Sequence, residues 1–298
     1  MLNTKTIMHM KMNFIIISSC FGHEFGALLA AKALGMSVKV VSKKDNKEEY
    51  EKDVNNIYDQ LSPFYDNIEV VPFEERERFI EAGWDFVQDL KDGKLDPSIW
   101  DKMAATKLEP SFEGLPEYPM LADGDTMYWT PQKWQTDGTC GASAAQQSLN
   151  PVVFLPILKK AGRVLFGQHY NKVTDMPSVL ELQEWMKEEL KKDMYVLGQK
   201  ENPEVLGIRG VKHVLYLKMF KKMKCAVGTP GTATWILLAC FPEVAQLIPF
   251  NEKVVEDWEL IAAAYQRAGH KIFAEKYCDN SDMSELSQRL DVAYDKLF

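Results

Sequence analysis

The opening of the chain constrains its fold most strongly, because short β-branched runs alternate there with a helical pattern. Residues 13–19 read NFIIISS, residues 20–26 read CFGHEFG, and a repeat of small and apolar residues then ends at Gly35. Residues 38–42, VKVVS, form a second β-branched run. A strand, a loop, a helix and another strand in this order predict a βαβ unit with a right-handed crossover. The chain is therefore expected to begin with a parallel sheet.

The same alternation continues and predicts the α/β class. Further strands are expected at residues 67–72, 126–129, 163–167, 194–197, 225–227 and 244–248. Helices are expected at residues 43–64, 74–91, 180–192, 211–222, 233–241, 254–268 and 281–298. A length of 298 residues is typical of about two domains. Two alternating α/β domains, with room for a cleft between them, are therefore expected, and the family resemblance described below implies that they are two Rossmann-like domains with an interdomain cleft.

Prolines bracket residues 150–156 and set the expected domain boundary. The N-terminal domain is expected to span 1–155 and the C-terminal domain 156–280. Residues 281–298 are expected to form a separate terminal helix.

Charge and cysteine usage narrow the class of protein. Lysine and arginine number 35 against 43 acidic residues, which gives a net charge of −8 and disfavours nucleic acid as a partner. A local group of lysines, Lys218, Lys221, Lys222 and Lys224, keeps DNA open as an alternative. The five cysteines are widely spaced and match neither a zinc motif nor a disulfide framework.

The expected location is cytoplasmic. Unpaired thiols are typical of a reducing compartment. The apolar stretch at residues 14–17 is too short for the core of a secretory signal, and no run approaches the length of a transmembrane segment.

The turn Gly228–Thr232 joins an expected strand to an apolar helix. Glycines let backbone N–H groups approach a ligand closely, and a helix N-terminus favours phosphate. A tight turn with a helix N-cap explains the same residues equally well. The segment lacks the lysine of a P-loop and does not match G-x-G-x-x-G, so neither ATP hydrolysis nor NAD binding is favoured.

Two other loops follow expected strands and carry polar side chains. His169 and Lys172 lie in the loop after residues 163–167, where Lys172 could neutralise a phosphate or simply be solvated. Glu252 follows another strand and could bind a sugar or ribose hydroxyl, or begin the next helix.

His23 and Glu24 lie where the first strand meets its helix. A neutral histidine can take a proton from a hydroxyl at cellular pH, and Glu24 is the weaker candidate for the same role. Asp123 and Asp125 could orient such a histidine. Helix capping for His23, and turn formation for the two aspartates, remain open alternatives.

Residues 16–42, IISSCFGHEFGALLAAKALGMSVKVVS, resemble the opening of the GT-B glycosyltransferases. Residues 211–250, VKHVLYLKMFKKMKCAVGTPGTATWILLACFPEVAQLIPF, resemble the donor-binding region of the heptosyltransferase-like branch of that family. That branch commonly has a histidine shortly after the turn, where this chain has Thr234 and Trp235.

The resemblance implies a GT-B-like fold with a nucleotide-sugar donor in the cleft and the terminal helix packed back on the first domain. By this resemblance, His23 corresponds to the general base of the family, which takes the proton of the acceptor hydroxyl. Gly228, Thr229, Gly231 and Thr232 match the turn that holds the donor diphosphate. Lys172 matches a phosphate-contacting basic residue by position.

The function expected from this resemblance is transfer of a hexosyl or pentosyl group from a nucleotide-sugar to an acceptor hydroxyl, with inversion and without a metal. The nucleotide-sugar is a co-substrate, and no further cofactor is expected. The acceptor classes are a glycan, a lipid-linked sugar or a modified nucleobase, the last as a hydroxymethylated base in DNA. The alternatives are a sugar-nucleotide epimerase and a non-catalytic nucleotide-binding protein.

Overall fold

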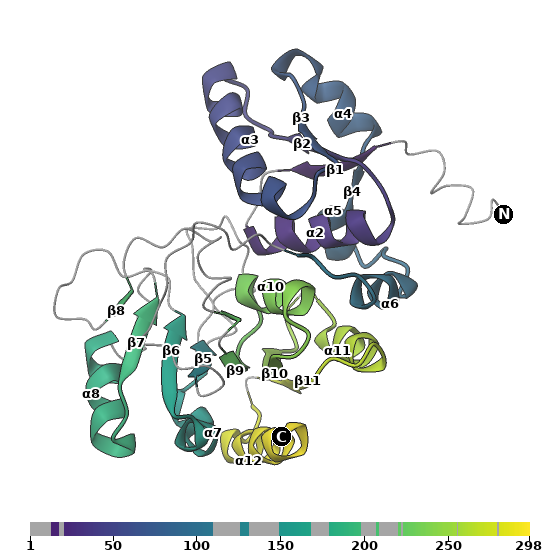
Figure 1. The fold of residues 1–298 in the computed structure, drawn as a ribbon. Coiled ribbons are helices and arrows are strands. Elements are labelled where there is room, and N and C mark those ends of the chain that lie inside the picture. The colour runs from purple at the N-terminus through teal and green to yellow at the C-terminus, as the bar shows by residue number, and fades with distance from the viewer. Residues whose placement is uncertain are drawn as a thin grey trace. The chain divides into compact units, whose positions relative to one another are not determined.

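The computed structural model describes residues 13–17, 21–109, 126–130, 149–167, 179–197, 207–208, 220–221, 223–254, 256–278 and 280–298. The chain divides into two compact units, Met1–Ser111 and Phe112–Phe298, and each contains a sheet of parallel strands (Figure 1). The expected α/β class with two Rossmann-like domains is confirmed by these two sheets.

The first unit contains a four-stranded sheet in the order β3-β2-β1-β4. Its elements are β1 (Phe14–Ile17), α2 (Phe21–Ala33), β2 (Val38–Val41), α3 (Lys47–Leu61), η1 (Ser62–Phe64), β3 (Ile68–Val70), η2 (Phe73–Glu75), α4 (Arg76–Ala82), β4 (Trp84–Asp85), α5 (Phe86–Lys91) and α6 (Ser98–Ala104). Asn46 begins α3 by accepting hydrogen bonds from the N–H groups of the first turn. The apolar stripe Tyr50, Val54, Ile57 and Leu61 buries the inner face of that helix.

The helix expected at 74–91 is wrong, because two short helices flank the strand β4 there. A Cβ atom on Gly83 would overlap the side chain of Ile15 and the carbonyl oxygen of Phe79. Gly83 therefore allows the chain to pass close to β1, and Trp84 then pairs with Phe14 in a parallel register. Tertiary pairing outweighs the helical pattern of this segment.

The second unit contains a seven-stranded sheet in the order β11-β10-β9-β5-β6-β7-β8. Its elements are β5 (Thr126–Thr130), η4 (Pro151–Phe154), α7 (Leu155–Lys160), β6 (Arg163–Gly167), α8 (Val179–Leu190), β7 (Met194–Leu197), β8 (Gly207–Ile208), β9 (Met223–Gly228), α10 (Thr232–Cys240), β10 (Ala245–Asn251), α11 (Trp258–Arg267), β11 (Ile272–Tyr277) and α12 (Met283–Leu297). One face of the sheet packs against α7, α8 and α12 around the fully buried Trp129 and Phe166. Helix α10 covers the opposite face (Figure 1).

The division of the chain differs from the expected boundary at 155/156. Strand β5 pairs with β6 and β9, so it is a central strand of the second sheet rather than part of the first domain. The prolines of the bracketed segment do not mark a linker. Pro151 and Pro156 lie in the first turns of η4 and α7, where a missing backbone N–H costs nothing.

The terminal helix α12 packs on the second unit, although the resemblance implied packing on the first domain. The Ser287 hydroxyl donates a hydrogen bond to the carbonyl of Val153 at 2.7 Å. Lys160, at the end of α7, forms ion pairs with Asp291 and Asp295 at 2.7 and 2.6 Å. These contacts make α12 part of the core of its own unit.

Candidate functional site

Each sheet has one position at which the strand order reverses. In the second sheet the chain runs from β5 outward through β6, β7 and β8, and then returns to β9 on the other side of β5. In the first sheet the corresponding position lies between β1 and β4. Ligands of open α/β sheets bind beyond the carboxyl ends of the strands at such switch points. The loops after β9 and β1 are therefore the places to search for chemistry.

The loop after β9 is held tightly against the end of β5. Gly228 has a φ angle of 142°, and a Cβ atom there would overlap the backbone carbonyl of Thr130. The N–H group of the next residue, Thr229, donates a hydrogen bond to that same carbonyl at 2.9 Å. Only glycine combines this φ angle with so close an approach. The close approach at Gly228 is to the end of β5, as in a tight turn, and the phosphate-binding role expected for this turn stays a prediction.

The N-terminus of α10 has backbone donors that no side chain caps. Gly231 is the N-cap residue and has no side chain, so it cannot accept from the first turn. The hydroxyl oxygen of Thr234 accepts from the Gly231 N–H at 3.0 Å, which fixes the turn but leaves the N–H groups that follow Gly231 uncapped. The partial positive charge of the helix end and these donors favour an anion here.

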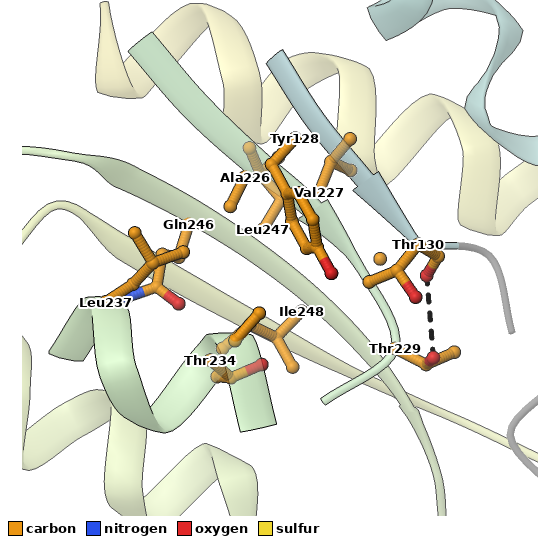
Figure 2. A pocket seen from close by; sticks show the side chains of 12 residues that line it. Tyr128, Thr130, Ala226, Val227, Thr229, Thr234, Leu237, Gln246, Leu247 and Ile248 are labelled. Carbon is orange, nitrogen blue, oxygen red and sulfur yellow. Dashed lines mark hydrogen bonds between the residues drawn. The ribbon is translucent and has the colours of Figure 1, made fainter. Parts of the chain in front are cut away.

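A small pocket with mixed polar and apolar lining lies between α10 and the sheet (Figure 2). Its volume of about 10 Å³ corresponds to about one water molecule. Tyr128, Ala226 and Gln246 form one row across β5, β9 and β10 and make up its floor. Because Ala226 carries only a methyl group, the space between the two longer side chains stays open. Thr234 and Leu237 of α10 cover the row from above.

The ring of Tyr128 is fixed on two sides. It packs edge-on against Phe220, with the ring centroids 5.2 Å apart. A Cβ atom on Gly167 would overlap the hydroxyl group of Tyr128, so this glycine leaves the space that the ring occupies. The tyrosine is 8% exposed and is packed into the unit rather than displayed for stacking on a sugar.

His23 and Glu24 lie in the first turn of α2, directly beyond the carboxyl end of β1. His23 is half-buried, and Glu24 is only 4% exposed. A carboxylate in the first turn is stabilised by the helix dipole. The structure thus places both residues at the switch point of the first sheet, as a site in an α/β fold requires.

The remaining predicted residues have different outcomes. Asp123, Asp125, His169 and Lys172 lie outside the described residues. Glu252 is exposed just after β10, and its N–H group donates to the carbonyl of Tyr277 at 2.8 Å.

Three findings concern cysteine chemistry, membranes and metal ions. Burial raises the pKa of the Cys225 thiol far above its usual range, so this cysteine is an uncharged core residue rather than a nucleophile. Among the described residues, no helix is long and apolar enough to cross a membrane. The described part of the chain also contains no group of three or more His, Cys, Asp or Glu residues suited to a metal ion.

Gln246 lines this pocket, and the sequence analysis did not single it out. It lies in the strand AQLIPFN, in which every residue is buried. A polar residue within such a run was the available signal, since buried polar groups normally have hydrogen-bond partners.

The structure defines a two-unit α/β protein with an uncapped helix N-terminus at one switch point. No protein-family model and no curated protein sequence matches the chain. Solved structures match weakly. An apo structure of OtsA is 12% identical with a TM-score of 0.34, covering 86% of this chain and 52% of that chain. The alpha,alpha-trehalose 6-phosphate synthase of Burkholderia multivorans is 9% identical with a TM-score of 0.27, covering 96% and 67%.

A hormone-sensitive lipase from a metagenome library also matches, at 11% identity and a TM-score of 0.23, covering 71% of this chain and 95% of that chain. The chain spans about half the length of OtsA. Similarities at this level assign neither a family nor an activity. The function is therefore argued from the residues themselves.

Proposed function

We propose that the protein is a glycosyltransferase that moves a sugar from a nucleotide-sugar donor to an acceptor hydroxyl. One observation carries this proposal: the N-terminus of α10, which no side chain caps, follows the positive-φ residue Gly228 at the switch point of the second sheet. Backbone donors in this place suit the diphosphate of a nucleotide-sugar. The resemblance of residues 16–42 and 211–250 to GT-B enzymes supports the same function.

In the proposed reaction the acceptor oxygen forms a bond to the anomeric carbon as the bond from that carbon to the phosphate oxygen breaks. The imidazole of His23 takes the proton of the acceptor hydroxyl. The nucleoside diphosphate leaves with the bonding electrons, and the N–H groups of α10 stabilise its added charge. Direct displacement inverts the anomeric configuration. Stabilisation by the helix end and Lys172 makes a divalent cation unnecessary in this proposal.

The donor is tested first by thermal shift. Purified protein is heated with UDP, GDP, ADP, CMP, TDP or their sugars, with and without magnesium. A ligand that binds only the folded state raises the melting temperature. We expect one nucleotide class to give a shift that magnesium does not change. The absence of a shift with every nucleotide, in protein shown to be folded, would argue against the donor site.

The catalytic role of His23 is tested by turnover of the nucleotide-sugar that binds. His23→Ala should lower the rate about a hundredfold or more, which is the usual contribution of a general base. His270→Ala is the matched control, because His270 lies before β11 at the amino edge of its sheet and packs on Tyr265. Equal rates in the two variants would remove the assignment of His23.

The acceptor follows from the same assay with candidate acceptors added. Product formation from a glycan, a lipid-linked sugar or hydroxymethylated DNA identifies the class. Consumption of the donor without any acceptor identifies the epimerase instead. Binding without turnover identifies a non-catalytic nucleotide-binding protein.

A further inference from the structure

A second pocket lies on the face of the second sheet that α7 and α8 cover. Its volume of about 400 Å³ falls within the range of about 300–1,000 Å³ that is usual for ligand pockets. The described residues that line it come from the start of η4 and from α8, and they are Asn150, Pro151, Val152, Glu181, Leu182 and Trp185. Because α10 covers the opposite face, the sheet separates this pocket from the turn between β9 and α10.

Both walls of this pocket are anchored to the second unit. The Ser287 hydroxyl of α12 donates a hydrogen bond to the carbonyl of Val153 in η4 at 2.7 Å. The side-chain amide of Gln183 in α8 donates to the carbonyl of Met194 in β7 at 2.7 Å. Walls that are fixed before a ligand arrives lower the entropy lost on binding, and most small-molecule sites are built in this way.

Trp185 gives the pocket an aromatic wall. It packs against the core that contains Leu182 and Met186, which holds the ring system in place. It is only half-buried, so part of the ring system stays accessible where it lines the pocket. Val152 is 58% exposed and adds an aliphatic group to the lining. These side chains suit a ligand that has an apolar face.

The polar side chains of the pocket require a ligand that both donates and accepts hydrogen bonds. The side-chain oxygen of Asn150 accepts from the Val152 N–H at 3.0 Å, so its NH₂ group is left to donate. The Glu181 carboxylate only accepts, and its two oxygens have room for several hydrogen bonds. A cationic ligand has no acceptor for the amide protons, and a phosphate is repelled by the carboxylate. A hydroxyl group satisfies both side chains.

We propose that this pocket binds a neutral sugar, with the C–H face of the ring against Trp185 and with hydroxyl groups hydrogen-bonded to Glu181 and Asn150. A pyranose has an apolar face and a rim of hydroxyl groups, which is the combination that the lining requires. A glycan bound here is held apart from the proposed catalytic site. The inference goes beyond the proposed function and does not depend on it, because sugar binding requires neither a donor nor turnover.

The test measures binding of maltose, cellobiose, lactose and chitobiose to the full chain by isothermal titration calorimetry, at millimolar sugar. We expect at least one of these disaccharides to bind. Glu181→Gln should raise its Kd about tenfold, because a hydrogen bond to a charged group is replaced by a weaker one. Glu184→Gln is the matched control, since Glu184 is exposed on the same helix and is not among the described residues that line the pocket. Its Kd should equal that of the unchanged protein.

Two further variants test the amide and the aromatic wall. In Asn150→Asp the capping oxygen is kept and the donors are removed, so the melting temperature should stay unchanged while the Kd rises. Trp185→Ala should raise the Kd about thirtyfold or more, and Trp185→Phe, which keeps a ring against the core, should give an intermediate value. Unchanged sugar affinity in folded Glu181→Gln and Trp185→Ala proteins would overturn the proposal.

Two small ions test the chemical class of the ligand. Tetramethylammonium probes a cation site at Trp185 and Glu181, and inorganic phosphate probes an anion site. Neither should bind with an affinity that changes in Trp185→Ala. Binding of either ion in place of the sugars would overturn the proposal, and so would a chain that binds none of the four disaccharides.

The outcomes separate this inference from the proposed function. A sugar bound as acceptor at the catalytic site does not depend on Trp185, whereas a sugar in this pocket does. If a disaccharide binds with that dependence but no nucleotide-sugar is consumed, the sugar pocket stands and the glycosyltransferase assignment fails. If nucleotide-sugars are turned over and no disaccharide depends on Trp185 for binding, only the pocket fails.

Discussion

Replacing Gly228 by alanine tests how the loop after β9 is built. At a φ angle of 142° an L-residue is strained, which costs about 1–2 kcal/mol. The new Cβ atom also overlaps the carbonyl of Thr130, and forcing a group into a packed place costs about 1–3 kcal/mol. Gly228→Ala should therefore destabilise the second unit by about 2–5 kcal/mol.

Gly231→Ala is the matched control in the same turn. Gly231 has a φ angle of −176°, which any residue can adopt, and a Cβ atom there would have no other atom within 4 Å. The free energy of unfolding of Gly231→Ala should stay within about 1 kcal/mol of that of the unchanged protein.

Differential scanning calorimetry measures both variants. Since about 1 kcal/mol shifts the melting temperature of a unit of this size by about 2–4 °C, Gly228→Ala should lower the transition of the second unit by roughly 4–20 °C. Equal shifts for the two glycines would refute the argument. So would a shift below about 2 °C for Gly228→Ala, because neither strain nor overlap would then be present.

Three further substitutions test contacts within the second unit. Lys192→Met should lower the free energy of unfolding by about 1–2 kcal/mol in urea, because the ammonium of Lys192 binds three carbonyl oxygens at the end of α7. Asp282→Ala should cost about 1 kcal/mol in the same assay, since Asp282 caps α12. Burial raises the pKa of Glu275 above its usual 4.5 although Arg289 lies 2.7 Å away. The folded protein thus holds this proton more tightly than the unfolded chain, so the stability of the unchanged protein relative to Glu275→Gln should fall as the pH rises above the unfolded value.

The strands of both sheets could be predicted from local composition, but the domain boundary could not. Strands such as β1, β2 and β6 consist of β-branched and apolar residues that any sheet would bury. Which sheet a strand joins depends on partners distant in sequence. Strand β5 pairs with β9, about a hundred residues later, and nothing within TMYWT indicates that partner. The order of the strands in the sheet therefore could not be predicted from the local sequence pattern.

The glycine turn was predictable because its residues act through their own backbone. Gly228 and Gly231 are adjacent to the helix that they precede, so their spacing alone indicates a close approach at a helix N-terminus. The side-chain part of the site was not predictable in this way. Gln246 joins Tyr128 only through the register of three strands, and this register is absent from the sequence.

Gln246 is a buried amide in the largely apolar strand β10. All seven residues of β10 are buried, and five of them are apolar side chains that gain stability from burial. The capping residues Asn46 and Asp282, in contrast, satisfy backbone donors and stabilise their helices.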